Sequence, residues 1–135
     1  MSKRIILNLT LIFILLVSWF CCTSQKVTKE LHGTWVVENF ILPEGEMLWI
    51  QLKVNMITFN KDGACKLPVR DLSKSDTAIW RYKKEESRHF IIIESAQDSI
   101  FNRKFQMTFS ERTQGDAVIK VLTLSSIWLM IKCSK

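Results

Sequence analysis

Alternating apolar and polar residues dominate the chain beyond residue 33 and predict β-strands. The runs are rich in β-branched and aromatic residues, and turn residues separate them. No window there has the sustained i, i+3, i+4, i+7 apolar spacing of a capped helix, although residues 27–32 have room for one short helical turn. The pattern predicts eight strands, at residues 34–42, 49–60, 64–70, 77–84, 89–95, 100–111, 117–124 and 127–133.

Short connections join the predicted strands in sequence order. Asp62-Gly63 is a hairpin signal between the second and third strands, and Pro68 predicts that the third strand is bent or lies at an edge. Eight consecutive strands with short connections indicate an all-β fold, an antiparallel up-and-down barrel. A barrel of eight strands is just wide enough for packed side chains or one small ligand. A two-sheet sandwich is the alternative architecture.

The residues that open the first predicted strand organise the rest of the chain. Gly33 permits a backbone turn that a side chain would resist, immediately before the strand begins. Trp35 and Val37 then lie on one face because side chains alternate along a strand. We therefore expect the large ring of Trp35 to close one end of the core.

Two short motifs resemble known proteins. The arrangement Leu31-x-Gly33-x-Trp35 resembles the first-strand motif of the lipocalin-like families, and residues 57–63 resemble the second-strand hairpin of small bacterial lipocalin-like domains. The resemblance covers about residues 28–135 and implies a closed barrel that carries a small ligand. The alternative is an ordinary strand with a core tryptophan in another β-fold.

The N-terminus resembles the signal sequence of a bacterial lipoprotein. Lys3 and Arg4 precede a 16-residue apolar stretch at 5–20, which as a helix would rise ~24 Å, less than the ~30 Å hydrocarbon core. A signal peptide at residues 1–21 is therefore expected rather than a permanent span. Cys22 is the predicted acylated residue because a small residue, Cys21, precedes it, and a polar tether follows at 22–27.

Lipid modification at Cys22 would place the domain at 28–135 in the cell envelope, at the outer membrane or the periplasmic face. A plain secreted protein and an uncleaved membrane anchor are the competing interpretations. The sequence does not indicate an oligomeric state or a partner protein.

Charge argues against a nucleic-acid partner. The chain has 19 basic and 13 acidic residues, a formal net charge of +6, and loss of Lys3 and Arg4 with the signal peptide would leave +4. Charges of both signs are interspersed, as in residues 83–86, which is typical of a solvated hairpin tip and not of a basic stripe.

Few residues carry recognisable chemistry. His32 and His89 have no further metal ligands at suitable spacing, so no metal site is expected. No nucleophile elbow, phosphate loop or dinucleotide-binding glycine pattern occurs, and we expect a non-enzyme without a cofactor. Cys65 and Cys133 fall in predicted strands, and either a disulfide bond or two buried thiols would fit an exported chain.

Strand alternation also predicts which side chains face the barrel interior. We expect these side chains to line a pocket that opens near the loop at 43–49, where Met47, Leu48 and Trp49 form an apolar patch. Such a pocket suits a fatty or aromatic ligand, with the Tyr82 hydroxyl orienting it. If the rings instead fill the interior, the alternative is an interaction module that presents loops to another envelope protein. The predicted pocket residues are Phe59, Trp80, Tyr82, Phe105, Met107 and Phe109.

Overall fold

The computed structural model describes residues 24–48 and 51–135, in two units that divide after Leu31. In the first unit, residues 24–31 form a helix, which is longer than the single turn predicted at 27–32 and includes the described part of the predicted tether. The predicted signal peptide and Cys22 lie outside the described residues. Within the described part of the chain, no helix is long and apolar enough to cross a membrane.

The second unit, residues 32–135, is built from eight antiparallel strands and one short 3-10 helix, η1. Its elements are β1 (Gly33–Ile41), β2 (Met56–Phe59), β3 (Ala64–Lys66), β4 (Thr77–Glu85), β5 (Arg88–Glu94), η1 (Ser99–Phe101), β6 (Lys104–Gln114), β7 (Ala117–Ser125) and β8 (Met130–Ser134). The predicted number and order of strands are confirmed.

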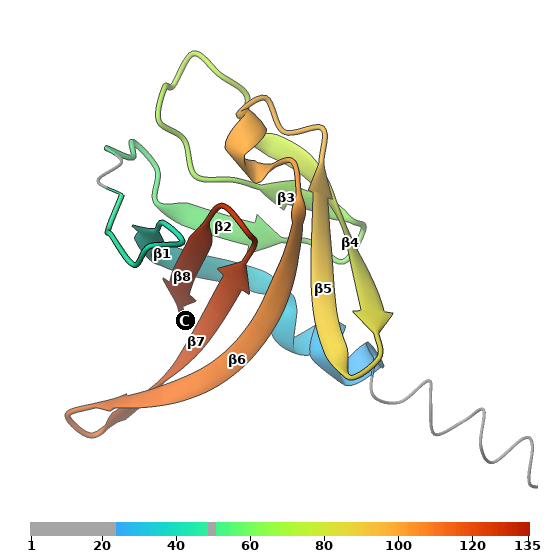
Figure 1. Cartoon of the computed structure of the whole chain (residues 1–135), viewed down its shortest axis with the longest axis vertical. Helices are drawn as coiled ribbons and strands as arrows, with labels where there is room; N and C mark the ends of the chain where they lie inside the picture. The colour runs from blue at the N-terminus through green and yellow to red at the C-terminus, as the bar shows by residue number, and fades with distance from the viewer. Residues whose placement is uncertain (1–23, 49–50) are drawn as a thin grey trace, which may run out of the picture. The chain divides into compact units, whose positions relative to one another are not determined.

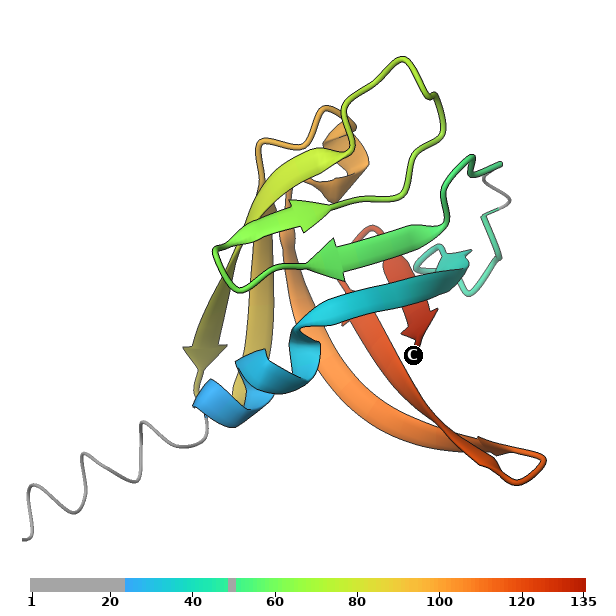
Figure 2. The same cartoon turned by 180° about the vertical axis from the view of Figure 1, so that it is seen from behind.

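The eight strands form one sheet that closes into a ring. Each strand pairs with its neighbours in sequence, and β1 also pairs with β8, so every strand has a partner on both sides along at least part of its length. Figure 1 shows the ring with the β6–β7 hairpin projecting beyond the neighbouring strands. Figure 2 is the opposite view, in which β1, β2 and β3 face the reader.

Three predicted strands are shorter than expected, and a fourth begins later. The strand predicted at 64–70 ends at Lys66, and the one predicted at 127–133 begins only at Met130. The prediction at 49–60 was wrong in length, because β2 has four residues and before it only Val54 forms a bridge, with Val69. The strand predicted at 100–111 begins only at Lys104 because Ser99–Phe101 form η1. Asp98 caps η1, since its side chain accepts a hydrogen bond from the Ile100 amide.

A β-bulge changes the alternation within β1. Val37 pairs with Cys133 and Asn39 pairs with Lys132, so Glu38 is the extra residue. As a result Trp35, Val37 and Phe40 are all buried, although Phe40 is an odd number of residues from the other two. The bulge therefore keeps the last large ring of β1 in the interior.

The core fills the ring with aliphatic and aromatic side chains. Trp35 is fully buried, and its ring centroid lies 6.0 Å from that of Phe109. Phe59 and Trp80 meet edge to face at 5.6 Å between centroids. Cys65 and Cys133 are buried within this core as free thiols, with no disulfide bond between them.

The antiparallel meander divides the connections between the two ends of the ring. The β1–β2, β3–β4, β5–β6 and β7–β8 connections, at residues 42–55, 67–76, 95–103 and 126–129, all lie at one end, which we call the long-loop end. The turns between β2 and β3, β4 and β5, and β6 and β7 lie at the opposite end, together with Gly33 at the start of β1.

Candidate ligand-binding site

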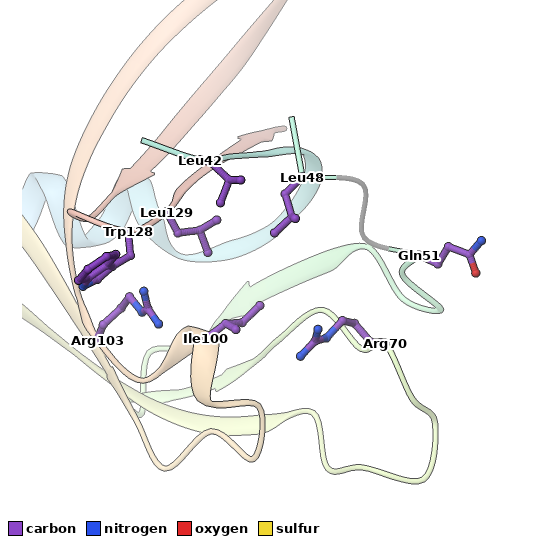
Figure 3. Close-up of a pocket in the computed structure, with 8 residues that line it drawn as sticks. All are labelled: Leu42, Leu48, Gln51, Arg70, Ile100, Arg103, Trp128 and Leu129. Atoms are coloured by element: carbon purple, nitrogen blue, oxygen red, sulfur yellow. The ribbon is translucent and has the colours of Figure 1, made fainter. Parts of the chain in front are cut away.

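A cavity of about 430 Å³ lies at the long-loop end (Figure 3). All four connections at this end contribute to it, so segments nearly 90 residues apart in sequence form one site. Its volume falls within the ~300–1,000 Å³ range of small-molecule pockets. The lining residues are Leu42, Leu48, Gln51, Arg70, Ile100, Arg103, Trp128 and Leu129.

Hydrogen bonds donated by backbone amides hold the three leucines of the lining. The Leu42 amide donates to the Glu46 carbonyl at 2.9 Å, and the Leu48 amide donates to the Phe40 carbonyl at 2.8 Å. In the last connection, the Leu129 amide donates to Ser126 Oγ at 3.1 Å. These bonds fix tight loops, so the leucine side chains enter the cavity from defined backbone positions.

Arg70 and Asp98 join two of the contributing connections. Arg70 Nε donates to Asp98 Oδ2 at 2.8 Å, and Arg70 Nη2 lies 2.6 Å from the same oxygen. Because the other oxygen of Asp98 caps η1, this pair links the β3–β4 connection to the helix that carries Ile100. The guanidinium of Arg70 is thus neutralised where it meets the cavity.

Arg103 is the second cation of the lining. Its amide donates to the Phe101 carbonyl at 2.8 Å and its carbonyl accepts from the Ile93 amide at 3.1 Å, which fixes the residue just before β6. Its Nε is buried and has no hydrogen-bond partner among the described residues. Figure 3 shows Arg103 and Arg70 directed between the apolar side chains, whereas Gln51 points away.

A second, wider depression of about 570 Å³ lies on the other side of Arg103 and Trp128, which line both spaces. Lys104 contributes to it, with Nζ over the Phe90 ring at 4.2 Å from the centroid and 2.5 Å from Glu85 Oε2. Lys104 is therefore already paired with a carboxylate.

The predicted pocket residues lie in the ring interior. Four of them, Phe59, Trp80, Phe105 and Met107, are buried in contact with the core, whereas Tyr82 and Phe109 are half-buried. The described part of the chain has two further cavities, of about 310 and 140 Å³, lined by residues 68–71, 74 and 75 with Asp98 and by residues 37–40, 47, 48 and 52. None of the six predicted pocket residues lines any of these four cavities. Of the predicted opening at 43–49, Leu48 does line the cavity.

The Tyr82 hydroxyl, predicted to orient a ligand, is engaged with a neighbouring ring. It lies 2.7 Å from His89 Nδ1, and the two rings stack with centroids 5.9 Å apart. Burial raises the pKa of Tyr82. Both side chains come from β4 and β5, next to the turn at the end opposite the cavity.

His32 also lies at that opposite end, away from the cavity. Its ring meets Trp80 edge to face at 5.8 Å, and burial together with Lys61 and Lys135 lowers its pKa. Among residues 24–48 and 51–135, no group of three or more His, Cys, Asp or Glu side chains is placed to hold a metal ion.

Sequence reasoning missed most of the cavity, because its residues lie in connections that alternation does not describe. The sequence predicts Ile100 as the first residue of a strand, whereas it lies in η1, and no sequence pattern marks Arg103 or Trp128. The signal that would have found them is topological: in a meander, every second connection meets at the same end. Comparisons with known proteins give no guide here, since no family model, curated protein or solved structure matches this chain.

Proposed function

We propose that this chain is an envelope lipoprotein, anchored through acylated Cys22, whose lipocalin-like barrel binds one small apolar ligand. The observation that carries the binding function is the cavity at the long-loop end, which five apolar side chains line. A concave, mostly apolar space with a few polar groups is the usual form of a small-molecule site. These side chains are Leu42, Leu48, Ile100, Trp128 and Leu129.

The closed ring of strands supports a binding function because it makes a rigid frame. All eight strands are paired on both sides, and a packed core lies beneath the cavity. The variable connections can then form a site without affecting strand pairing, as loops on a stable scaffold commonly do. The membrane anchor rests on the apolar stretch at 5–20 and the cysteine that follows it.

The test is to fill the cavity with a larger side chain. Ile100 is half-buried on η1 and faces the cavity, so Ile100→Trp should occupy the space where the ligand lies. The purified full chain would be titrated with the neutral apolar dye N-phenyl-1-naphthylamine, whose fluorescence rises in apolar surroundings. We expect saturable binding by the wild type and at least tenfold weaker binding by Ile100→Trp.

Ile79→Trp is the matched control because Ile79 is exposed on β4 and lines none of the four cavities. It should bind the dye like the wild type, and thermal melting should show that both variants are folded. Dye binding that survives in folded Ile100→Trp, or that is absent from the wild type, would remove the carrier function at this cavity.

An interaction module is the second candidate, and one observation favours it. Ile127 and Trp128, in the short β7–β8 connection, are 79% and 68% exposed. Adjacent exposed apolar residues of this size are typical of surfaces that another protein covers. If the dye does not bind, Ile127 and Trp128 are the residues to substitute in a search for a protein partner.

A further inference from the structure

Arg103 lines the cavity and carries an unsatisfied hydrogen-bond donor. Its Nε is buried without a hydrogen-bond partner, and none of the ion pairs among the described residues includes Arg103. A buried cationic donor without a partner is costly, because it has lost its hydration without gaining a hydrogen bond. The site is therefore incomplete as it stands in the protein alone.

The other polar groups of the cavity do not supply the missing partner. Arg70 is already paired with Asp98, and Gln51 points away from the space between the apolar side chains (Figure 3). The lining residues include no carboxylate. Arg103 is thus the one charged residue of this lining that has no paired carboxylate among the described residues.

We infer that the ligand is an amphipathic anion, with an apolar body and one anionic headgroup that Arg103 binds. This inference rests on the proposed carrier function and adds the chemistry of the ligand. A guanidinium presents parallel N–H donors that match a carboxylate, and charge-assisted bonds of this kind are stronger than neutral hydrogen bonds. The apolar body would lie against Leu42, Leu48 and Leu129. A fatty-acid-like molecule has this combination of parts.

The experiment compares two ligands that differ only in the headgroup. Dodecanoate and dodecanol have the same chain length, and each would displace N-phenyl-1-naphthylamine from the full chain below its aggregation concentration. We expect dodecanoate to bind the wild type at least tenfold more tightly than dodecanol, the fold-change typical of one charge-assisted hydrogen bond. Arg103→Met keeps an unbranched apolar stem and removes the guanidinium with its charge, so the preference for dodecanoate should disappear.

Two further variants make the result specific. Arg103→Lys restores the charge without the fork of donors and should recover part of the preference for dodecanoate. Arg81→Met is the matched control, because Arg81 is exposed on β4, pairs with Glu94 and lines none of the four cavities. It should leave the preference unchanged.

The outcomes separate this inference from the carrier function. If dodecanol displaces the dye from the wild type as well as dodecanoate does, the cavity binds apolar ligands without recognising an anionic headgroup. The inference then fails, but the carrier function stands. A preference that persists in folded Arg103→Met would also overturn it, since the headgroup would then lie elsewhere. If neither compound displaces the dye and the dye itself does not bind, the carrier function fails.

Discussion

Glu38 and Arg112 form an ion pair across 74 positions of the chain, joining the bulge of β1 to β6. Both oxygens of Glu38 accept hydrogen bonds from the guanidinium, in the two-point arrangement that suits arginine and a carboxylate. These strands are not neighbours in the ring, because β7 and β8 lie between them. The pair therefore ties the bulge to a distant strand.

This pair makes stability depend on pH. Hydrogen bonds from Arg112 are the main reason why the pKa of Glu38 lies below the ordinary glutamate value of 4.5. The folded protein thus keeps Glu38 charged to lower pH than the unfolded chain does, so the stabilisation is present above about pH 4.5 and is lost as pH falls through the folded pKa. Glu38→Gln should lower the free energy of unfolding by roughly 1 kcal/mol or less near neutral pH.

Urea unfolding near pH 7 and near pH 3 would measure this difference, which should shrink at the lower pH. Glu111→Gln is the control because Glu111 is exposed on the same strand as Arg112 and forms no ion pair among the described residues. A Glu38→Gln effect of equal size at both pH values would show that the charge of Glu38 does not contribute.

Trp35 should be the most costly tryptophan to remove. It is fully buried, packs against Phe109 and has Lys135 Nζ 5.1 Å from its ring centroid. Trp35→Ala leaves a large void and should lower the free energy of unfolding by ~3–5 kcal/mol, a large part of the stability of a small domain. Trp128→Ala is the matched control: Trp128 is mostly exposed, so its loss should change stability by about 0.5 kcal/mol or less.

Thermal melting and urea unfolding of both tryptophan variants provide the measurement. Equal melting temperatures for Trp35→Ala and the wild type would show that the core does not depend on this ring. A large loss of unfolding free energy in Trp128→Ala would instead mean that the Trp128 side chain stabilises the β7–β8 connection.

The two core thiols should be unreactive in the folded protein. Burial raises the pKa of both Cys65 and Cys133 to about 12, so neither forms the nucleophilic thiolate near pH 8. With Cys21 and Cys22 replaced by serine, a water-soluble thiol reagent should label no cysteine of the native chain and both cysteines in denaturant. Ser73→Cys, in an exposed loop, should be labelled at once and shows that the reagent is active. Rapid labelling of the native core would contradict the closed ring.

Strand number and order could be predicted from the sequence because alternation is a local property of each run. The bulge could not, since it depends on how β1 pairs with β8, almost 100 residues away. Strict alternation from Trp35 and Val37 would point Asn39 inward and Phe40 outward, whereas Phe40 is buried. The same limit applies to the site: alternation places Phe59 and Phe105 in the interior but does not tell whether a space remains between them.

The cavity itself depends on contacts between connections. Arg70 and Asp98 lie 28 residues apart, and their pairing sets where η1 and therefore Ile100 lie. No local pattern encodes such a contact. The polar run at 71–76 predicts a loop, which is found, whereas Pro68 lies in the same connection and not in the bent or edge strand predicted at 64–70. The partner of this connection becomes visible only in the folded ring.

The last prediction concerns the cellular location of the protein and rests on the sequence before residue 24. We expect the mature chain to begin at Cys22 and to carry at least two acyl chains, because a single chain gives only marginal membrane binding. Cells supplied with a fatty-acid analogue that can be tagged should yield a labelled protein in the membrane fraction, and intact mass should show loss of residues 1–21.

Two serine variants identify the modified residue. Cys22→Ser should abolish both the label and the processing, whereas Cys21→Ser should keep them, since serine is also a small residue before the acylated cysteine. A label lost from Cys21→Ser but kept by Cys22→Ser would move the site to Cys21. An unlabelled wild-type chain recovered from the soluble fraction would remove the anchor, while leaving the cavity and its ligand to be decided by the binding experiments alone.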